Sequence, residues 1–350
     1  MQKIVFILSF LVCFSLFGQN RFREKHYTYY DGLSSDWVNH ATTSQKGFLY
    51  LFTQRGISVF DGYRFIQSEQ IKQGIVSQFI KNDTLYFEDI EALKKISLNQ
   101  LGTNPITVTA KNFNDSDPNN DHFENLFIDT KNRIWCSDFD HIKYSENGSE
   151  FKSFEIFTDH KRNIRSVFFT EISKNEIWSA TTNGLWIWKN NQMKKHPNKF
   201  LSDKYYTTLY KLDNSFLLLA TSNEIIIWNI KENKLKSIIP NPENPILCIT
   251  EANGELFAST KNSVYKFNRN TSKLNLFYTS QHTINHLFFD VKTKLFWVST
   301  TNGLTKLILP KKGIETFLFD ENSTVTSICE TSNGIYAVTN LGTLWKFHNH

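Results

Sequence analysis

The chain has 350 residues, of which 40% are hydrophobic and 15% aromatic. This composition excludes an intrinsically disordered protein, and the length exceeds what one hydrophobic core usually serves, so two domains or one modular array is indicated. The net charge of +5 comes from interleaved acidic and basic residues. That balance excludes the concentrated basic stripe of a nucleic-acid-binding protein.

The first residues are typical of a secretory signal peptide. A positive residue, Lys3, precedes the apolar run Ile4–Phe17, and small or polar residues follow at 18–20. The run is too short for a membrane span, and no later segment approaches about 20 consecutive apolar residues. We therefore expect a signal peptide at residues 1–19, a mature chain over 20–350 that is exported to the periplasm or cell surface, and no transmembrane span in it.

Eight similar units follow a lone strand-like segment, HYTYY at residues 26–30. Each unit has an aromatic or large apolar anchor within an apolar run, and the anchors recur about every 40 residues, a period typical of repeat proteins. The anchors are Tyr50, Tyr86, Trp135, Trp178, Leu218, Phe257, Trp297 and Tyr336. This period favours one modular array over two unrelated domains.

Within a unit, the pattern indicates short β-strands. An apolar run leads to a polar turn, then to the anchor strand, then to a turn rich in Thr, Asn and Gly, and then to a third and often a fourth strand. The phrase TTNG, at 181–184 and again at 300–303, is the clearest example of this second turn. Such strands and turns predict antiparallel sheets, because Asn and Gly tolerate the left-handed backbone of a tight turn.

Repeated four-stranded units predict an all-β protein that folds as a single β-propeller, because a ring of sheets leaves no long exposed strand edge. We count eight repeats, and the weak second unit at 76–99 leaves seven open. The last unit stops at LWKF, residues 344–347, with only three strands. We therefore expect the N-terminal strand at 26–30 to complete this final blade and to close the ring.

The first repeat carries a more specific pattern. It has DGL at 31–33, the turn TQRGI at 53–57 and FDG at 60–62. In this order the phrases resemble the two-component regulator propeller repeat, and looser copies cover nearly the whole mature chain. The resemblance implies an extracytoplasmic sensor propeller of Bacteroidetes-type hybrid two-component systems, many of which respond to glycan breakdown products.

The chain departs from that family after the ring. A propeller pair there is usually followed by a β-sandwich, a membrane helix, a histidine kinase and a regulator domain, and this sequence has no recognisable counterpart of the last four. We therefore expect no kinase activity or DNA binding from this chain. A truncated sensor kinase and a stand-alone sensory subunit both remain open.

Catalytic and metal-binding motifs are absent from the sequence. There is no GxSxG, HExxH, Walker or CxxC motif, so we expect no enzyme activity, no cofactor and no metal site. His40 and His286 occupy matching positions on the first strands of their units and so near the inner wall of the ring. Ser166 and Ser327 are at corresponding positions. We expect these residues to line the wall as polar side chains rather than to bind a metal.

Ligand binding is expected on one face of the ring. The turns between second and third strands and the connections between blades lie at the same end of an up-and-down sheet. The candidate binding residues at this end are Asp36, Trp37, Arg55, Arg162, Arg165, Tyr205, Tyr206 and His282. Aromatic rings beside charged groups suit sugars, since apolar sugar faces stack while hydroxyls form hydrogen bonds. In the alternative interpretation, Trp37 and the tyrosine pair are wedges between blades.

The sequence thus predicts an extracytoplasmic ligand-binding propeller of a two-component system, with a saccharide-like ligand. Its expected partners are an oligosaccharide and a membrane histidine kinase or another envelope protein, with a homodimer left open and nucleic acid excluded. The alternative is a surface protein-interaction scaffold for secretion or assembly. A propeller hydrolase or lyase is the third hypothesis.

Overall fold

In a computed structural model, the described residues are 23–75, 77–89, 92–100, 104–110, 124–138, 141–156, 167–242, 244–268, 271, 273–308, 324–331 and 334–347. The expected signal peptide lies outside them. The chain divides into two compact units, unit 1 (Met1–Leu309) and unit 2 (Pro310–His350). The single expected domain over 20–350 is therefore described in two parts.

Unit 1 contains seven four-stranded antiparallel sheets. The first three consist of β2 (Val38–Thr43), β3 (Leu49–Thr53), β4 (Gly56–Phe60) and β5 (Phe65–Gln67); β6 (Ser77–Lys81), β7 (Thr84–Glu88), β8 (Ala92–Ser97) and β9 (Ile106–Ala110); and β10 (Glu124–Ile128), β11 (Ile134–Ser137), β12 (His141–Ser145) and β13 (Lys152–Glu155). The next two consist of β14 (Val167–Ser173), β15 (Glu176–Thr181), β16 (Gly184–Lys189) and β17 (Gln192–Lys195); and β18 (Tyr206–Lys211), β19 (Phe216–Thr221), β20 (Glu224–Asn229) and β21 (Lys234–Pro240). The last two consist of β22 (Cys248–Ala252), β23 (Glu255–Ser259), β24 (Ser263–Asn268) and β25 (Lys273–Thr279); and β26 (Ile284–Asp290), β27 (Leu295–Thr300), β28 (Gly303–Ile308) and β1 (Arg23–Tyr27).

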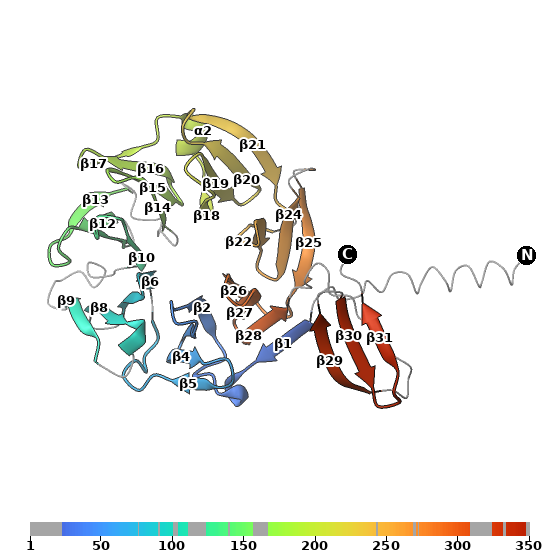
Figure 1. Cartoon of the computed structure of the whole chain (residues 1–350). Helices are drawn as coiled ribbons and strands as arrows, with labels where there is room; N and C mark the ends of the chain where they lie inside the picture. Colours follow the sequence, from blue (N-terminus) through green and yellow to red (C-terminus); the bar gives the residue numbers. More distant parts are fainter. Residues whose placement is uncertain are drawn as a thin grey trace, which may run out of the picture. The chain divides into compact units, whose positions relative to one another are not determined.

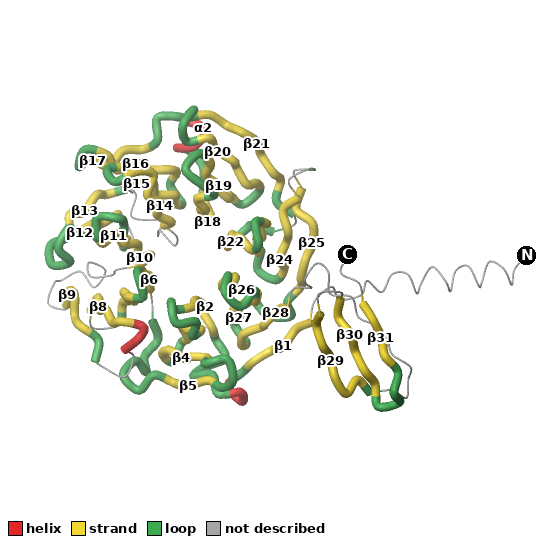
Figure 2. The backbone as a smooth tube through the Cα atoms, viewed as in Figure 1, coloured by secondary structure: helices red, strands yellow, loops and turns green. Residues whose placement is uncertain are grey.

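These seven sheets lie as blades around a common axis, and the first strand of each is the innermost (Figure 1). In the described part of the ring, strands alternate with turns within each sheet (Figure 2). Apolar clusters fill the spaces between neighbouring blades, as in the cluster that joins Tyr50 and Phe52 of the first sheet to Leu85 and Phe87 of the second. The all-β propeller class is confirmed.

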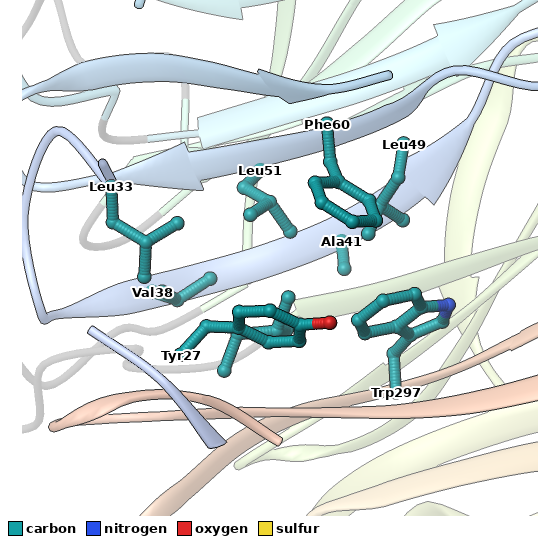
Figure 3. Close-up of a cluster of buried hydrophobic side chains, with 9 residues drawn as sticks. Tyr27, Leu33, Val38, Ala41, Leu49, Leu51, Phe60 and Trp297 are labelled. Carbon is teal, nitrogen blue, oxygen red and sulfur yellow. The ribbon is translucent and has the colours of Figure 1, made fainter. Parts of the chain in front are cut away.

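The N-terminal strand completes the seventh sheet, not the eighth as expected. β1 pairs antiparallel with β28, with Tyr27 opposite Leu304. Tyr27 is buried against Trp297 of the seventh sheet and Phe60 of the first, with ring centroids 6.2 and 5.7 Å apart (Figure 3). Burial of an aromatic side chain contributes roughly 1.5–3 kcal/mol. The register of β1 is therefore set by apolar packing at the place where the first and last blades of unit 1 meet.

The recurring Thr-x-x-Gly phrase is the turn between second and third strands, as predicted. Thr181 Oγ1 donates a hydrogen bond to the Gly184 carbonyl (2.9 Å) and accepts one from the Asn183 N–H (2.9 Å). Gly184 has a φ of 95°, and a Cβ there would lie 1.9 Å from the Ser202 carbonyl oxygen. Glycine is required because the backbone is left-handed and because the next inter-blade connection passes directly over it.

Unit 2 contains the eighth repeat as a three-stranded antiparallel sheet of β29 (Val325–Thr331), β30 (Gly334–Thr339) and β31 (Leu344–Phe347). The described helices are short: η1 (Tyr29–Asp31), η2 (Leu98–Gln100) and α2 (Lys199–Ser202). None of the helices in the described ranges is long and apolar enough to span a bilayer.

Candidate functional site

The candidate site is one end of the ring, where turns and inter-blade connections meet. Asn183 Nδ2, in the β15–β16 turn, donates to the Ile156 carbonyl (2.7 Å), and the Asn241 N–H donates to the Asn223 carbonyl (2.8 Å) in the next sheet. Each bond joins such a turn to the connection beside it. The prediction that both kinds of segment share one face is therefore confirmed.

Asp36, Trp37 and Arg55 lie together on this face. Asp36 Oδ1 accepts a hydrogen bond from the Tyr29 N–H (2.5 Å), which fixes the orientation of the Asp36 carboxylate. The Trp37 carbonyl accepts the Gln54 N–H (3.2 Å), so the indole-bearing residue adjoins the β3–β4 turn. Trp37 is 40% exposed, and Arg55 is exposed on that turn. These hydrogen bonds thus place residues that carry an indole, a carboxylate and a guanidinium at one end of the first sheet.

His282 extends this group onto the seventh sheet. The Asp36 carbonyl accepts the Gly303 N–H (2.5 Å), and Asn302, one residue before, has its Nδ2 3.0 Å from His282 Nε2. Consecutive contacts therefore connect the Arg55 turn, Trp37, Asp36 and His282 along the edge where the first and seventh sheets meet. We call these four residues the seam row.

The other predicted binding residues do not join the seam row. Tyr205 and Tyr206 precede and begin β18, on the connection between the fourth and fifth sheets. Tyr205 is exposed, but Tyr206 is fully buried and its hydroxyl donates to the Leu201 carbonyl (2.8 Å). Burial raises the pKa of Tyr206 above its ordinary value. Tyr206 is a core residue, which corrects its assignment as a ligand contact, while Arg162 and Arg165 lie outside the described residues.

His40 and His286 meet across the same edge, one layer deeper. Each lies directly after a register shift in the innermost strand of its sheet. The rings stack with centroids 3.7 Å apart, and both Nδ1 atoms are buried without a hydrogen-bond partner. Burial lowers the pKa of His40 to about 4. The pKa of His286 is lowered by burial and then by the charge of His40.

Neutral imidazoles are therefore expected here at pH 7. Ser166, considered with them as a third inward group, lies outside the described residues, and Ser327 belongs to unit 2. Within the described ranges, no three His, Cys, Asp or Glu side chains are grouped for metal binding.

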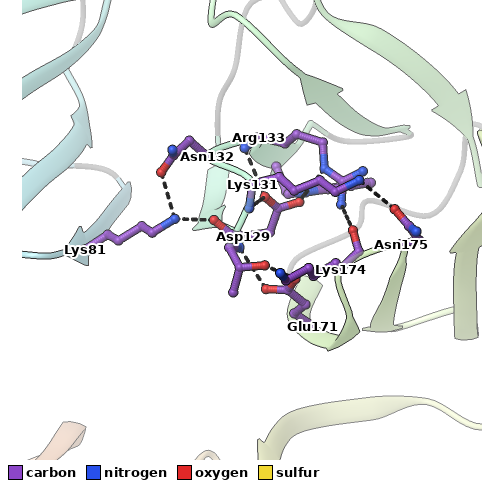
Figure 4. A network of polar contacts seen from close by, with 10 residues as sticks. Lys81, Asp129, Lys131, Asn132, Arg133, Glu171, Lys174 and Asn175 are labelled. Atoms are coloured by element: carbon purple, nitrogen blue, oxygen red, sulfur yellow. Dashed lines mark hydrogen bonds and ion pairs between the residues drawn. The ribbon is translucent and has the colours of Figure 1, made fainter.

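The opposite end of the ring carries a polar network that the sequence did not single out (Figure 4). Asp129, fully buried, accepts hydrogen bonds from Arg133 Nε (2.5 Å) and Trp135 Nε1 (2.9 Å). Arg133 also donates to the Lys174 carbonyl of the fourth sheet (3.0 Å), and Lys81 of the second sheet donates to the Asp129 carbonyl. The network joins three neighbouring blades. Its polar groups form hydrogen bonds with one another, so we do not assign them to ligand binding.

Comparison with known proteins places this fold among several solved propellers. The extracellular domain of the putative hybrid two-component system BT3049 from B. thetaiotaomicron is 17% identical, with a TM-score of 0.64 over 94% of this chain and 48% of that one. The extracellular domain of the putative one-component system BT4673 from the same organism is 15% identical, with a TM-score of 0.62 over 95% and 46%. A catalytically inactive virginiamycin B lyase from Staphylococcus aureus with quinupristin is 16% identical, with a TM-score of 0.62 over 83% and 100%.

These likenesses show a shared propeller fold. The chain spans about half the length of the two B. thetaiotaomicron domains. No family model and no curated protein matches the sequence.

Proposed function

We propose that this chain is the extracytoplasmic ligand-binding propeller of a signal-transduction system, and that a saccharide-like ligand binds at the seam row. Binding rather than catalysis is its role in this proposal. The resemblance of the first repeat to sensor propellers supports the class of protein, and two structural neighbours are extracellular domains of such systems.

The observation that carries the proposal is the composition of the seam row. The partly exposed Trp37 and its neighbour Asp36 are hydrogen-bonded through their carbonyls to Gln54, next to Arg55, and to Gly303, next to Asn302, whose side chain contacts His282. An aromatic face stacks on the apolar face of a sugar ring, and the charged groups and imidazole offer donors and acceptors to hydroxyls or a carboxylate. These hydrogen bonds hold the backbone of the contributing segments in place before a ligand arrives, which lowers the entropic cost of binding.

The position of the row supplies a signalling mechanism. Residues of the first and seventh sheets contribute to it, so a ligand that contacts both favours the arrangement in which those sheets are closely packed. A ligand shifts an equilibrium only by its differential affinity for the two states. The shift would bias a membrane histidine kinase or another envelope protein that contacts the propeller.

Thermal unfolding of the exported chain against a panel of neutral and acidic oligosaccharides tests this proposal. A ligand that binds only the folded ring adds about 2.7 kcal/mol of stability at a hundredfold excess over Kd. We expect a saturable rise in Tm with one sugar class, and Trp37→Ala and Arg55→Ala should each remove it. Tyr63→Ala, which deletes a 93% exposed aromatic ring in the β4–β5 turn, is the matched control.

Two results would contradict the proposal. The absence of any shift across the panel would reject the saccharide class. A fall of many degrees in the Tm of ligand-free Trp37→Ala would instead identify Trp37 as a wedge between blades.

A surface protein-interaction scaffold is the second candidate function. It is favoured by the apolar side chains that unit 2 exposes, among them Ile328 and Leu344. In this case no oligosaccharide of the panel changes the Tm, and binding of a protein partner depends on unit 2 rather than on the seam row.

A further inference from the structure

Two histidines from different sheets stack where the first and seventh sheets meet. The rings of His40 on β2 and His286 on β26 have centroids 3.7 Å apart and planes inclined by 25°. Both rings are partly exposed, so a proton can reach them, but both Nδ1 atoms are buried without a hydrogen-bond partner in the described part of the chain. We call His40 and His286 the histidine pair.

The histidine pair fits this interface only in its neutral form. An imidazolium carries a proton on both ring nitrogens, so protonation leaves each Nδ1 as a charged donor without an acceptor. A buried donor of this kind is costly. Two protonated rings in contact would also repel each other. Protonation therefore favours an arrangement in which the rings lie farther apart and closer to water.

The described groups that face the histidine pair from neighbouring strands supply no negative charge. From β3, Phe52 packs on one ring, with centroids 5.9 Å apart, and on β27, Ser299 is the cross-strand neighbour of the other. On β22, burial raises the pKa of the Cys248 thiol to about 11, so the thiol stays neutral. Burial and then the charge of Glu251, also on β22, raise the pKa of Tyr210, so this carboxylate acts on the fifth sheet.

Two carboxylates lie at the ends of this interface and are already hydrogen-bonded. Asp36 precedes β2 and accepts a hydrogen bond from a backbone N–H of η1. Asp290 ends β26 and accepts one from the Lys292 N–H (3.0 Å). Burial lowers the pKa of His40, and burial and then the charge of His40 lower that of His286. Among the described residues, no carboxylate offsets a proton on the pair.

We propose that the interface between the first and seventh sheets is acid-sensitive, so that protonation of the histidine pair separates β2 from β26 locally while the other blade interfaces stay packed. Asn285 Nδ2 donates to the Val38 carbonyl (2.9 Å) directly beside the pair. Separation of the two strands therefore breaks this bond as well. It also moves Trp37, the neighbour of Val38, away from the seventh sheet.

Acid would then also act on the seam row, which lies along the same interface. A ligand that contacts both sheets favours the packed arrangement and hence the neutral pair, so its affinity falls as the pH falls. This consequence rests on the proposed function. The acid-sensitive interface itself does not, and it is tested without any ligand.

Hydrogen exchange of the full chain, resolved to single amides, tests the proposal. The Gly303 N–H donates to the Asp36 carbonyl (2.5 Å) at this interface, whereas the Ile284 N–H donates to the Lys261 carbonyl (2.7 Å) between the sixth and seventh sheets. Rates are corrected for the intrinsic effect of pH. With a pKa of about 4 for His40 when packed and 6.5 when separated, opening at Gly303 should be about thirtyfold more frequent at pH 5.0 than at pH 7.5. Opening at Ile284 should not change.

Variants identify the groups that respond to acid. The double variant His40→Phe and His286→Phe keeps two stacked rings but cannot be protonated, so the response at Gly303 should disappear. The double variant His40→Gln and His286→Gln makes the same test with smaller side chains, in case the phenyl rings overpack the interface. His282→Gln is the matched control, because His282 lies at the same interface outside the pair. It should retain the response.

Three results would overturn the proposal. The first is an unchanged opening frequency at Gly303 in the unaltered chain. The second is an equal response in either folded double variant, since the histidine pair would then not be its cause. The third is a parallel rise at Gly303 and Ile284, because acid would then loosen the whole ring rather than one interface. A failed sugar panel would leave all three readings unaffected.

Discussion

Two interfaces between neighbouring blades are held together by different chemistry. Between the third and fourth sheets, Arg133 links the buried Asp129 carboxylate to the Lys174 carbonyl, and Thr130 donates to Glu171. Between the first and seventh sheets, two neutral imidazoles stack, and Asn285 Nδ2 donates to the Val38 carbonyl (2.9 Å). The first interface depends on charges that are already paired, and the second on groups that must stay uncharged.

The largest loss of stability is expected when a buried charge loses its ion-pair partner. Arg133→Met removes the partner of Asp129, whose side chain is 0% exposed. Removal of one member of a buried pair costs about 3–5 kcal/mol because the other charge stays buried. Urea unfolding measures this loss. Lys189→Met, which removes a 59% exposed side chain from its ion pair with Glu176, is the control and should cost under about 1 kcal/mol. Equal losses in the two variants would contradict the interpretation.

The second largest loss of stability is expected from a steric clash between β28 and β1. Gly303 has a φ of 100°, and a Cβ there would lie 2.3 Å from the Tyr27 carbonyl oxygen. Gly303→Ala combines a strained backbone, which costs about 1–3 kcal/mol, with displacement of β1. Gly62 has the same φ and open space around its Cβ, so Gly62→Ala isolates the strain. The difference in unfolding free energy between the two variants measures how tightly β1 is held. Equal values would mean that β1 moves away from the added Cβ without a measurable cost.

Acid should weaken the histidine interface selectively. The pKa of His40 is about 4 in the folded chain, below the ordinary 6.5 of the unfolded state, so the unfolded state binds more protons between these values. Stability is therefore full above about pH 6.5 and is lost as pH falls toward 4. At pH 5 the loss from His40 alone is about 1–2 kcal/mol, and His286 adds to it in the same direction.

Unfolding at pH 7.5 and pH 5.0 checks this expectation. The double variant His40→Gln and His286→Gln should show a smaller difference between the two pH values. The groups packed around the pair do not supply a compensating charge: Phe52 contacts His40, and Cys248 on β22 accepts a hydrogen bond from the Leu287 N–H next to His286. Burial raises the pKa of the Cys248 thiol to about 11, which keeps it neutral. Parallel pH dependence in both proteins would show that the imidazoles do not control the seam.

The smallest effect is expected from the loss of one neutral side-chain hydrogen bond between the first and seventh sheets. Asn285→Ala removes the donor to the Val38 carbonyl and should cost about 1 kcal/mol. Thr207→Val removes a similarly placed bond, from Thr207 Oγ1 to the Ile246 carbonyl (2.6 Å), between the fifth and sixth sheets. Chemical denaturation should give comparable losses. A much larger loss for Asn285→Ala would mean that the interface between the first and seventh sheets is the least stable interface of the ring.

Much of this architecture could be predicted from local sequence, because each blade is built from neighbouring strands. The Thr-x-x-Gly turn at Gly184 and the innermost position of His40 both follow from the pattern of one repeat. The partner of β1 could not be predicted in this way, because its pairing with β28 depends on packing between residues that are far apart in the chain. The burial of Tyr206 beside the exposed Tyr205 depends likewise on α2, whose Leu201 carbonyl accepts the phenol.

The pairing of β1 with β28 has a consequence for folding in the cell. His26 and Thr305, which contact each other in this pair, are 279 residues apart in sequence. β1 can therefore pair with β28 only after nearly the whole ring has been synthesised. Contacts of such high sequence separation also form slowly. During that delay the apolar side of the first blade is uncovered and prone to aggregation. Aggregation during this delay, rather than final stability, would then limit the yield of the folded protein.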